Sequence, residues 1–215
     1  MFTSRIDAGN KLAYELLKRS FKKPVVLGIT RGGVVVAAAV ARVLKAPLYP
    51  LVIKKVSASF NPEFAIGAVG PEGVSVGEFS QEMAQQVADR MKMYGAGDLS
   101  KKIKKRTAII VDDGIATGWT FRAALHYVQG KLPGKIVIAV PVADRGIANK
   151  FRKEVDELIV LQEVDDLGAV GNYYEDFSQV SDEEVRALIG GVDRGVKRWK
   201  TEVKMKKGGE KLWQR

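Results

Sequence analysis

The sequence predicts an α/β fold: a doubly wound, mainly parallel sheet with helices on both faces and a small β-hairpin or hood as an addition. Short, strongly apolar segments alternate with amphipathic segments of helical length, which is typical of parallel strands joined by crossover helices. A glycine-rich stretch over residues 54–77 interrupts this alternation and predicts the added hairpin. With 215 residues, the chain fits one main domain, residues 1–190, followed by a basic tail, residues 191–215.

The first half of the chain begins with a βαβ unit. Apolar residues at helical spacing predict a helix over 6–18, and a continuous apolar run predicts a buried strand over 24–29. A tight turn over 30–33 is followed by a helix over 34–44 and a second buried strand over 48–53, which implies parallel strands and a right-handed crossover. Residues 54–77 are expected to form an irregular loop and a β-hairpin, residues 80–94 a helix, and the Gly- and Lys-rich residues 95–105 a mobile segment.

The second half of the chain resumes the alternation of strands and helices. The pattern predicts a strand over 107–111, a helix over 117–129, a strand over 135–140, a helix over 144–155 and a strand over 157–161. Ser181 and Glu184 have the spacing of a capping box, which predicts a short helix that runs to residue 189.

Composition excludes several classes of site. The chain has no cysteine, which excludes disulfides, thiolate nucleophiles and cysteine-based metal sites. The one histidine, His126, lies in a predicted helix with apolar neighbours and is expected to be structural or exposed. Apolar runs stay shorter than the roughly 18 residues of a membrane span, and the first residues lack a signal-peptide core, so we expect a cytoplasmic protein. Of the net charge of +10, +6 lies in residues 190–215, which hold nine Lys or Arg and three Asp or Glu, and the remaining +4 on the body suits an anionic ligand.

Two turns are expected to lie at the same edge of the predicted sheet. One is Thr30-Arg31-Gly32-Gly33, and the other begins with Asp112-Asp113-Gly114. Each turn follows the carboxyl end of a predicted parallel strand, and open α/β sheets bind their ligands at that edge. This placement is the main physical indication of a site.

The second turn has the residue types that bind a phosphorylated sugar. Two acids follow a buried strand, and the small residues Gly114-Ile115-Ala116-Thr117-Gly118 then lead into a helix. Backbone N–H groups at a helix N-terminus bind phosphate, while carboxylates accept hydrogen bonds from sugar hydroxyls or hold a metal through water. The alternative is a solvated acidic turn with Thr117 as a helix cap. Receiver domains and phosphatases also place acids after a strand.

The whole segment, four apolar residues followed by Asp-Asp-Gly-Ile-Ala-Thr-Gly-Trp-Thr, closely resembles the signature of type I phosphoribosyltransferases. The resemblance covers about residues 2–189. It implies that the segment binds 5-phosphoribosyl-1-pyrophosphate (PRPP). Asp112 and Asp113 would bind the ribose hydroxyls and, in the second shell, Mg²⁺. The 5-phosphate would be held by the turn and the start of the helix, namely Gly114, Ile115, Ala116, Thr117, Gly118, Trp119 and Thr120.

The turn after the first strand resembles the pyrophosphate loop of the same family. The resemblance implies a cis peptide bond between Thr30 and Arg31, with Thr30, Arg31 and Gly32 facing pyrophosphate. Lys54 and Lys55 follow the second strand and are similar to the basic pair that orotate-type members use against pyrophosphate. The alternatives are a plain glycine turn and a solvated pair of lysines.

The base that accepts the ribose is not identified by the sequence. Residues 61–70 and 168–174 resemble a branch of the family that lacks an assigned base. A hood over residues 164–174, with Val164, Tyr173 and Tyr174 as candidate contacts, is expected to cover the base. One of the two tyrosines would stack on the base or, alternatively, pack into the core. Ala116 replaces the acid of hypoxanthine/guanine-type members, and Trp119 replaces a usually small residue.

The sequence therefore favours an Mg²⁺-dependent phosphoribosyltransferase that moves ribose 5-phosphate from PRPP to a nucleobase or related nitrogen nucleophile. The residues expected to be catalytic are Asp112, Asp113, Arg31 and Lys55. The alternative is a regulatory protein of the same fold that senses PRPP or a nucleotide and binds nucleic acid through its tail. A dinucleotide-binding or P-loop protein is disfavoured because G-x-G-x-x-G and Gly-Lys-Ser/Thr are absent.

The tail carries most of the positive charge. Val192, Val196, Trp199 and Val203 fall on one stripe of a helix, with lysines and arginines mostly off that stripe. Such a helix could bind nucleic acid or a membrane. We expect instead that it packs on its own chain or on a second copy in a homodimer, with no membrane partner.

Overall fold

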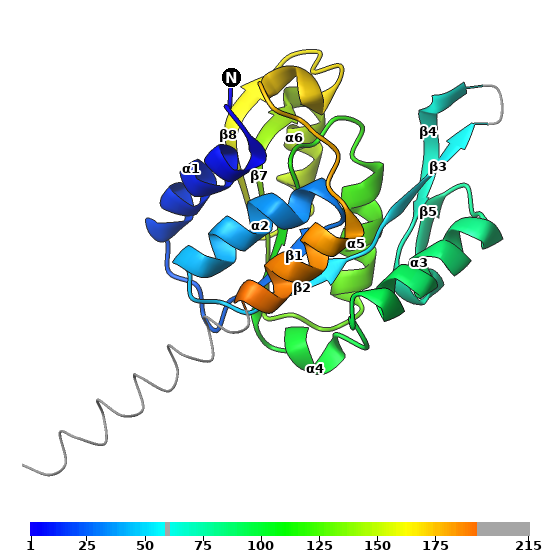
Figure 1. The fold of residues 1–215 in the computed structure, drawn as a ribbon, viewed down its shortest axis with the longest axis horizontal. Helices are drawn as coiled ribbons and strands as arrows, with labels where there is room; N and C mark the ends of the chain where they lie inside the picture. Colours follow the sequence, from blue (N-terminus) through cyan, green and yellow to red (C-terminus); the bar gives the residue numbers. More distant parts are fainter. Residues whose placement is uncertain (59–60, 193–215) are drawn as a thin grey trace, which may run out of the picture.

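A computed structural model describes residues 1–58 and 61–192, and it confirms the doubly wound sheet (Figure 1). Five parallel strands form the main sheet in the order β2-β1-β6-β7-β8. Their bounds are β1 (Val25–Ile29), β2 (Leu48–Leu51), β6 (Thr107–Val111), β7 (Lys135–Asp144) and β8 (Glu157–Val164). The order reverses between β1 and β6, so the crevice where ligands bind in such sheets lies between these two strands.

Helices cover both faces of this sheet, because successive strand residues are apolar on both sides. In β6, Ile109 and Val111 pack toward one face while Ala108 and Ile110 pack toward the other. The first face is covered by α1 (Arg5–Leu17), α2 (Gly32–Val43) and a helix over residues 182–192. The second face is covered by α4 (Ser100–Ile103), α5 (Trp119–Gln129) and α6 (Arg145–Phe151) (Figure 1).

The addition predicted over residues 54–77 is a separate antiparallel sheet of three strands rather than one hairpin beside an irregular loop. It consists of β3 (Lys54–Ala58), β4 (Asn61–Val69) and β5 (Ser75–Gly77), with the short helix η1 (Pro71–Gly73) before β5. Register shifts near Val56 and Ser57 interrupt the pairing of β3 with β4. Helix α3 (Gln81–Met93) packs beside this small sheet (Figure 1).

Local capping residues define several helix ends. The Ser80 hydroxyl accepts a hydrogen bond from the Met83 amide at the start of α3. Ser181 and Glu184 form the predicted capping box, with reciprocal hydrogen bonds of 2.7 and 3.1 Å. The helix that follows extends to residue 192, three residues beyond the prediction.

Two neighbouring elements, β7 and α6, differ clearly from their predicted extent. β7 continues to Asp144, whose side chain caps α6, so this strand is longer and α6 shorter than expected. In the segment 95–105, Leu99 and Ile103 are buried against the second face of the sheet. Its predicted mobility stays a prediction. His126 is exposed, as expected.

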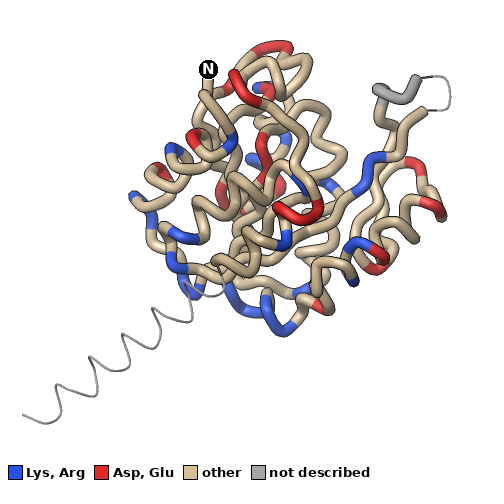
Figure 2. Tube along the Cα trace, in the orientation of Figure 1, with Lys and Arg blue, Asp and Glu red and all other residues tan. Residues whose placement is uncertain are grey.

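Charge is spread unevenly over the described residues. Figure 2 shows basic residues concentrated around α4, where Lys101, Lys102, Lys104 and Lys105 are exposed. This segment precedes β6, so it lies at the opposite edge of the sheet from the acids that follow β6. Within residues 1–58 and 61–192, the helices are all too short or too polar to cross a membrane. The tail stripe from Val196 onward and the nucleic-acid prediction lie outside the described residues, and the domain boundary at residue 190 stays a prediction.

Candidate active site at the ends of β1 and β6

The two predicted turns lie side by side because β1 and β6 are neighbouring parallel strands. Gly28 pairs with Val111, so the turn after β1 and the turn after β6 leave the sheet at the same level. The peptide bond between Thr30 and Arg31 is cis, as predicted. Together the turns line a cavity of about 570 Å³.

Gly32 and Gly33 let the start of α2 approach the acids that follow β6. A Cβ atom on Gly32 would lie 2.2 Å from the Asp113 Oδ2 atom, and one on Gly33 would lie 2.4 Å from the Asp112 Oδ1 atom. The second position would also be 2.7 Å from the Asp112 Cα atom, so a side-chain rotation could not relieve the contact. The two glycines are therefore required by the packing of one turn on the other.

Asp112 is a half-buried carboxyl group that faces a second acid. Burial, followed by the charge of Asp113, raises the pKa of Asp112 well above its usual value, while the charge of Lys55 opposes this shift. The Asp113 amide donates a 2.9 Å hydrogen bond to the Asp112 Oδ1 atom. A cationic ligand group or a donor hydroxyl would favour the charged form of this pair.

Asp113 is held by Arg5, a residue that sequence reasoning missed. The Arg5 Nε atom donates to the Asp113 Oδ2 atom at 2.8 Å, and the two side chains are only 11% and 16% exposed. The Arg5 guanidinium also lies 3.7 Å from the centre of the Phe177 ring and donates to the Ser178 carbonyl oxygen at 2.8 Å. Arg5 and Phe177 both line the cavity.

The chain segment after β8 is tied to the N-terminus beside the acids. The Phe2 amide donates to the Tyr173 carbonyl oxygen at 2.8 Å, and the Phe2 and Tyr174 rings are in contact. The Tyr174 hydroxyl donates a 2.6 Å hydrogen bond to the Asp113 carbonyl oxygen. Burial, and then the charge of Asp113, raises the pKa of the Tyr174 hydroxyl, so it remains a donor at neutral pH.

The loop from Gly114 to Gly118 is fixed on two sides. Ile115 is buried and pairs with β7 through its amide and its carbonyl, with hydrogen bonds of 2.9 Å to Val142 and Asp144. Gly118 has a φ of 81°, a conformation that favours glycine, and it starts α5 without a side-chain cap. Thr117 is thus not the cap of this helix, and the first amides of α5 keep their capacity to bind an anion.

Most of the residues predicted to bind PRPP line this one cavity. Those that do are Thr30, Arg31, Gly32, Lys55, Asp112, Asp113, Gly114, Ala116, Thr117, Gly118 and Thr120. Four further residues of the cavity lie within the hood predicted over residues 164–174, although the sequence did not assign them individual roles: Gly168, Ala169, Val170 and Gly171. Val170 lies against Gly114 of the loop.

Six predicted residues lie elsewhere. Ile115 is buried beneath the loop, and the Trp119 ring packs against Gly77 of β5. Lys54 is half-buried among Arg31, Arg90 and Asp182, and burial followed by the charge of Arg90 lowers its pKa. The remaining three are near the hood: Tyr174 is buried, while Val164 and Tyr173 are partly buried and pack with it, so these positions fit the alternative of core packing better than stacking on a base.

Comparison with known families identifies this arrangement. Residues 3–176 match the model of the phosphoribosyl transferase domain, a span that covers most of the chain and both turns. The chain belongs to the phosphoribosyl transferase family. This match confirms the family and the fold that were predicted from the signature after β6.

Individual proteins resemble this chain in sequence or in fold. A protein of Mycobacterium tuberculosis (strain H37Rv) named "Putative phosphoribosyl transferase" is 37% identical over 210 residues, which are 90% of this chain and 47% of that protein. The chain thus spans about half the length of this relative. A crystal structure of TT1426 from Thermus thermophilus is 36% identical, with a TM-score of 0.73 and coverage of 87% of this chain and 97% of that one. The AQ2163 protein from Aquifex aeolicus shares the fold at 16% identity, with a TM-score of 0.53 and 78% of each chain covered.

Proposed function

We propose that the chain transfers the ribose 5-phosphate group of PRPP to a nitrogen nucleophile, a nucleobase or a related compound, and releases pyrophosphate. The observation that carries this proposal is the convergence of three elements on one cavity. These are the acid pair after β6, the uncapped start of α5 and the turn with the cis peptide after β1. Each element suits a different part of PRPP.

The 5-phosphate is assigned to the loop before α5. Backbone amides at a helix N-terminus bind phosphate through hydrogen bonds and through the helix dipole. Thr117 and Thr120 line the cavity and add hydroxyl donors. Ala116 also lines the cavity and carries only a methyl group, which leaves room for a phosphate beside these amides.

The ribose hydroxyls are assigned to Asp112 and Asp113. Arg5 occupies one oxygen of the Asp113 carboxylate, Oδ2, which leaves the other to accept a hydroxyl hydrogen bond. Mg²⁺ prefers oxygen ligands and keeps several waters. The two carboxylates fit an ion held mostly by PRPP and water, since the described residues offer no group of three or more acids or histidines that could hold a metal. Such an ion would neutralise part of the charge on pyrophosphate.

Pyrophosphate is assigned to Arg31, Gly32 and Lys55. Lys55 is exposed on β3 and lies close enough to Asp112 for its charge to lower that pKa. The Arg31 guanidinium is 3.7 Å from Asp182, so it can turn from this carboxylate to a pyrophosphate oxygen. Two cations and the amides of the turn would stabilise the negative charge as pyrophosphate leaves.

The nucleophile is assigned to the side of the loop that faces β7 and β8. A smaller cavity of about 220 Å³ lies there, lined by Ala116, Thr117, Asp144, Asp166, Leu167 and Gly168. Asp144 and Asp166 can accept hydrogen bonds from ring or amino N–H groups. This cavity lies in the region of the predicted hood, which began at Val164.

The chemistry requires positioning more than a protein nucleophile. A nitrogen lone pair of the acceptor forms the bond to C1 of the ribose while the bond between C1 and the pyrophosphate oxygen breaks. Pyrophosphate leaves with that electron pair, and the proton on the acceptor nitrogen passes to water. The site accelerates this step by holding both reactants in line and by stabilising the leaving charge.

The test is pyrophosphate release from PRPP and Mg²⁺ with a panel of nucleobases and small nitrogen nucleophiles. We expect release that depends on one acceptor. Asp113→Asn should abolish PRPP binding measured by calorimetry. The control is Asp165→Asn, because the Asp165 side chain is 80% exposed and its ion pair with Arg145 lies outside the cavity. Unchanged PRPP affinity in Asp113→Asn, with the fold retained by circular dichroism, would overturn the assignment of the acid pair.

We also propose a homodimer, in the cytoplasm. Three exposed apolar or aromatic residues lie on one side of helix α1: Ile6, Tyr14 and Leu17, whose exposed fractions are 61%, 75% and 52%. An apolar side of this kind suits a second copy of the chain. Light scattering should give twice the mass of one chain, and Tyr14→Glu should reduce it to the mass of one chain. An unchanged mass for Tyr14→Glu would exclude α1 as the contact.

A further inference from the structure

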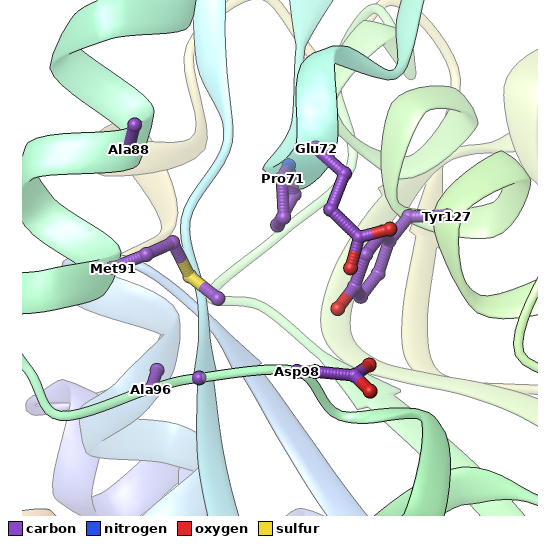
Figure 3. A pocket seen from close by; sticks show the side chains of 8 residues that line it. Pro71, Glu72, Ala88, Met91, Ala96, Asp98 and Tyr127 are labelled. Atoms are coloured by element: carbon purple, nitrogen blue, oxygen red, sulfur yellow. The ribbon is translucent and has the colours of Figure 1, made fainter.

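Another cavity lies away from the acid pair and shares no residue with the 570 Å³ cavity or the 220 Å³ cavity described above. It has a volume of about 290 Å³ and is formed by η1, α3, the loop over residues 96–98 and the last turns of α5 (Figure 3). Helix α5 begins at the proposed phosphate loop and reaches Tyr127 near its end. This cavity and the 570 Å³ cavity at the acid pair therefore lie at opposite ends of one helix.

The walls of this cavity differ in chemistry. Pro71, Met91 and Ala96 give it an apolar side, whereas Glu72, Asp98 and Tyr127 give it a polar side. Figure 3 shows the two carboxylates and the tyrosine hydroxyl gathered together, with the Met91 side chain extending toward them from α3. Cavities that bind small molecules commonly combine an apolar wall with a few convergent polar groups.

The Tyr127 hydroxyl is an unpaired polar group in this wall. The residue is 2% exposed, and its oxygen makes no hydrogen bond of ordinary geometry among the described residues. The Leu99 backbone and the Glu72 carboxylate lie close enough to act on its pKa as hydrogen-bonding groups. Buried hydroxyls are nearly always paired, so an exception indicates a missing partner. Burial, followed by the charge of Glu72, raises the pKa of this hydroxyl to about 12, so it remains protonated at neutral pH.

The charges around the hydroxyl leave an excess of negative charge. Both oxygens of Glu72 accept hydrogen bonds from the Lys131 Nζ atom, at 2.7 and 2.6 Å. Asp98 is 3.8 Å from the same ammonium, and its closest partners are the neutral amide and hydroxyl of Ser100. Two carboxylates thus share one close cation, and exposed Lys101 adds only a weaker attraction to Asp98. Lys131 also lies 4.8 Å from the centre of the Tyr127 ring, which shows that this wall accommodates a cation.

We propose that this cavity is a second binding site, for a small organic cation with a flat or short aliphatic apolar body. Its amine or amidine head would lie between the Tyr127 hydroxyl and the Asp98 carboxylate, and its body would pack on Met91 and Pro71. The head would give the hydroxyl its missing partner and balance the second acid. The apolar body would cover the side chains of the opposite wall.

Benzamidine is a suitable probe, and benzamide is its neutral counterpart of the same shape. With the full chain, isothermal titration should show saturable benzamidine binding in the millimolar range or tighter. Benzamide should bind about tenfold more weakly, because hydrogen bonds between charged groups are roughly twice as strong as neutral ones. Neither measurement needs PRPP or activity, so the result is independent of the proposed transfer reaction.

Variants locate the site. Tyr127→Phe removes one oxygen that has no partner, so the fold should be retained, and Asp98→Asn changes an exposed side chain. Each should weaken benzamidine binding about fivefold. The control is Asp89→Asn, an exposed carboxylate of α3 that does not line the cavity. The proposal fails if benzamidine does not bind, if benzamide binds equally well, or if both variants bind benzamidine like the control.

Discussion

The pairing of Arg5 with Asp113 makes a prediction about stability that can be worked through in detail. Arg5→Met keeps the length of the side chain but removes its charge. The variant loses the 2.8 Å ion pair with Asp113, the 2.8 Å hydrogen bond to the Ser178 carbonyl and the contact of the guanidinium with the Phe177 ring. It also leaves the charge of Asp113 beside Asp112 without its cation.

The magnitude follows from the burial of the pair. Removing one partner of a fully buried ion pair costs about 3–5 kcal/mol, whereas exposed pairs contribute about 0–1 kcal/mol. The Arg5 and Asp113 side chains are 11% and 16% exposed, which places them nearer the buried limit. Methionine still covers part of the Phe177 ring. We therefore expect Arg5→Met to lower the free energy of unfolding by about 2–3 kcal/mol.

The assay is equilibrium unfolding in urea, arranged as a double-mutant cycle with Asp113→Asn. The coupling free energy between the two changes should be about 1.5 kcal/mol or more, since each removes the same charged contact. Lys11→Met is the control because it breaks an ion pair on the same helix whose lysine is 53% exposed. Its cost should stay below about 0.5 kcal/mol.

Two results would refute this reasoning. One is a cost for Arg5→Met no larger than that for Lys11→Met. The other is a coupling free energy below about 0.5 kcal/mol, the usual limit for residues that do not interact. Either would mean that Arg5 does not hold Asp113 in solution.

Three further predictions concern the same site. Asp112→Asn should raise the free energy of unfolding at neutral pH. A carboxyl group whose pKa is raised in the folded state destabilises the protein as the pH rises above the unfolded-state pKa of 3.8, and asparagine removes this effect. In urea unfolding, the gain over wild type should grow from about pH 4 upward, while PRPP binding is lost. Gly33→Ala should lower the free energy of unfolding by about 1–2 kcal/mol, because overpacking against Asp112 exceeds the gain of up to about 1 kcal/mol in helix propensity. The control is Gly97→Ala, whose Cβ atom would meet no atom within 4 Å and should change the unfolding midpoint little. Tyr174→Phe should cost about 1–2 kcal/mol in the same assay by leaving the Asp113 carbonyl oxygen unpaired, and an unchanged midpoint would contradict that hydrogen bond.

The main sheet could be predicted from the sequence because its signals are local. β1 and β6 are runs of five buried residues. Each run is followed by a turn that contains glycine or aspartate, residue types that are typical of turns. Once the strands were placed, their parallel arrangement brought Asp112, Asp113 and the turn at Gly32 to one edge. The part of the candidate site that the two turns form could therefore be predicted from the sequence.

The contacts that complete the site could not be predicted in this way. Arg5 is 108 residues from Asp113, and Tyr174 is 61 residues from it. In the sequence, Arg5 is one charged residue at the start of an amphipathic helix, and Tyr174 is an aromatic residue in a loop. Only the packing of the chain after β8 on the N-terminus brings them to the acids. The small sheet was predicted only in part, as a hairpin, because its third strand, β5, has three residues and is too short to show an alternating pattern.

The charges of the site are paired with one another in the structure, and this bears on how PRPP would bind. Arg5 pairs with Asp113, and Arg31 lies 3.7 Å from Asp182 while Lys54 and Arg90 lie close to the same carboxylate. Pyrophosphate can attract Arg31 only in competition with Asp182. The measured PRPP affinity therefore reports a difference between two sets of ion pairs rather than the full attraction of the cations. On this argument, Asp182→Asn should strengthen PRPP binding in calorimetry, although Asp182 does not itself line the cavity. A weaker or equal affinity would show that Asp182 positions Arg31 instead of competing for it.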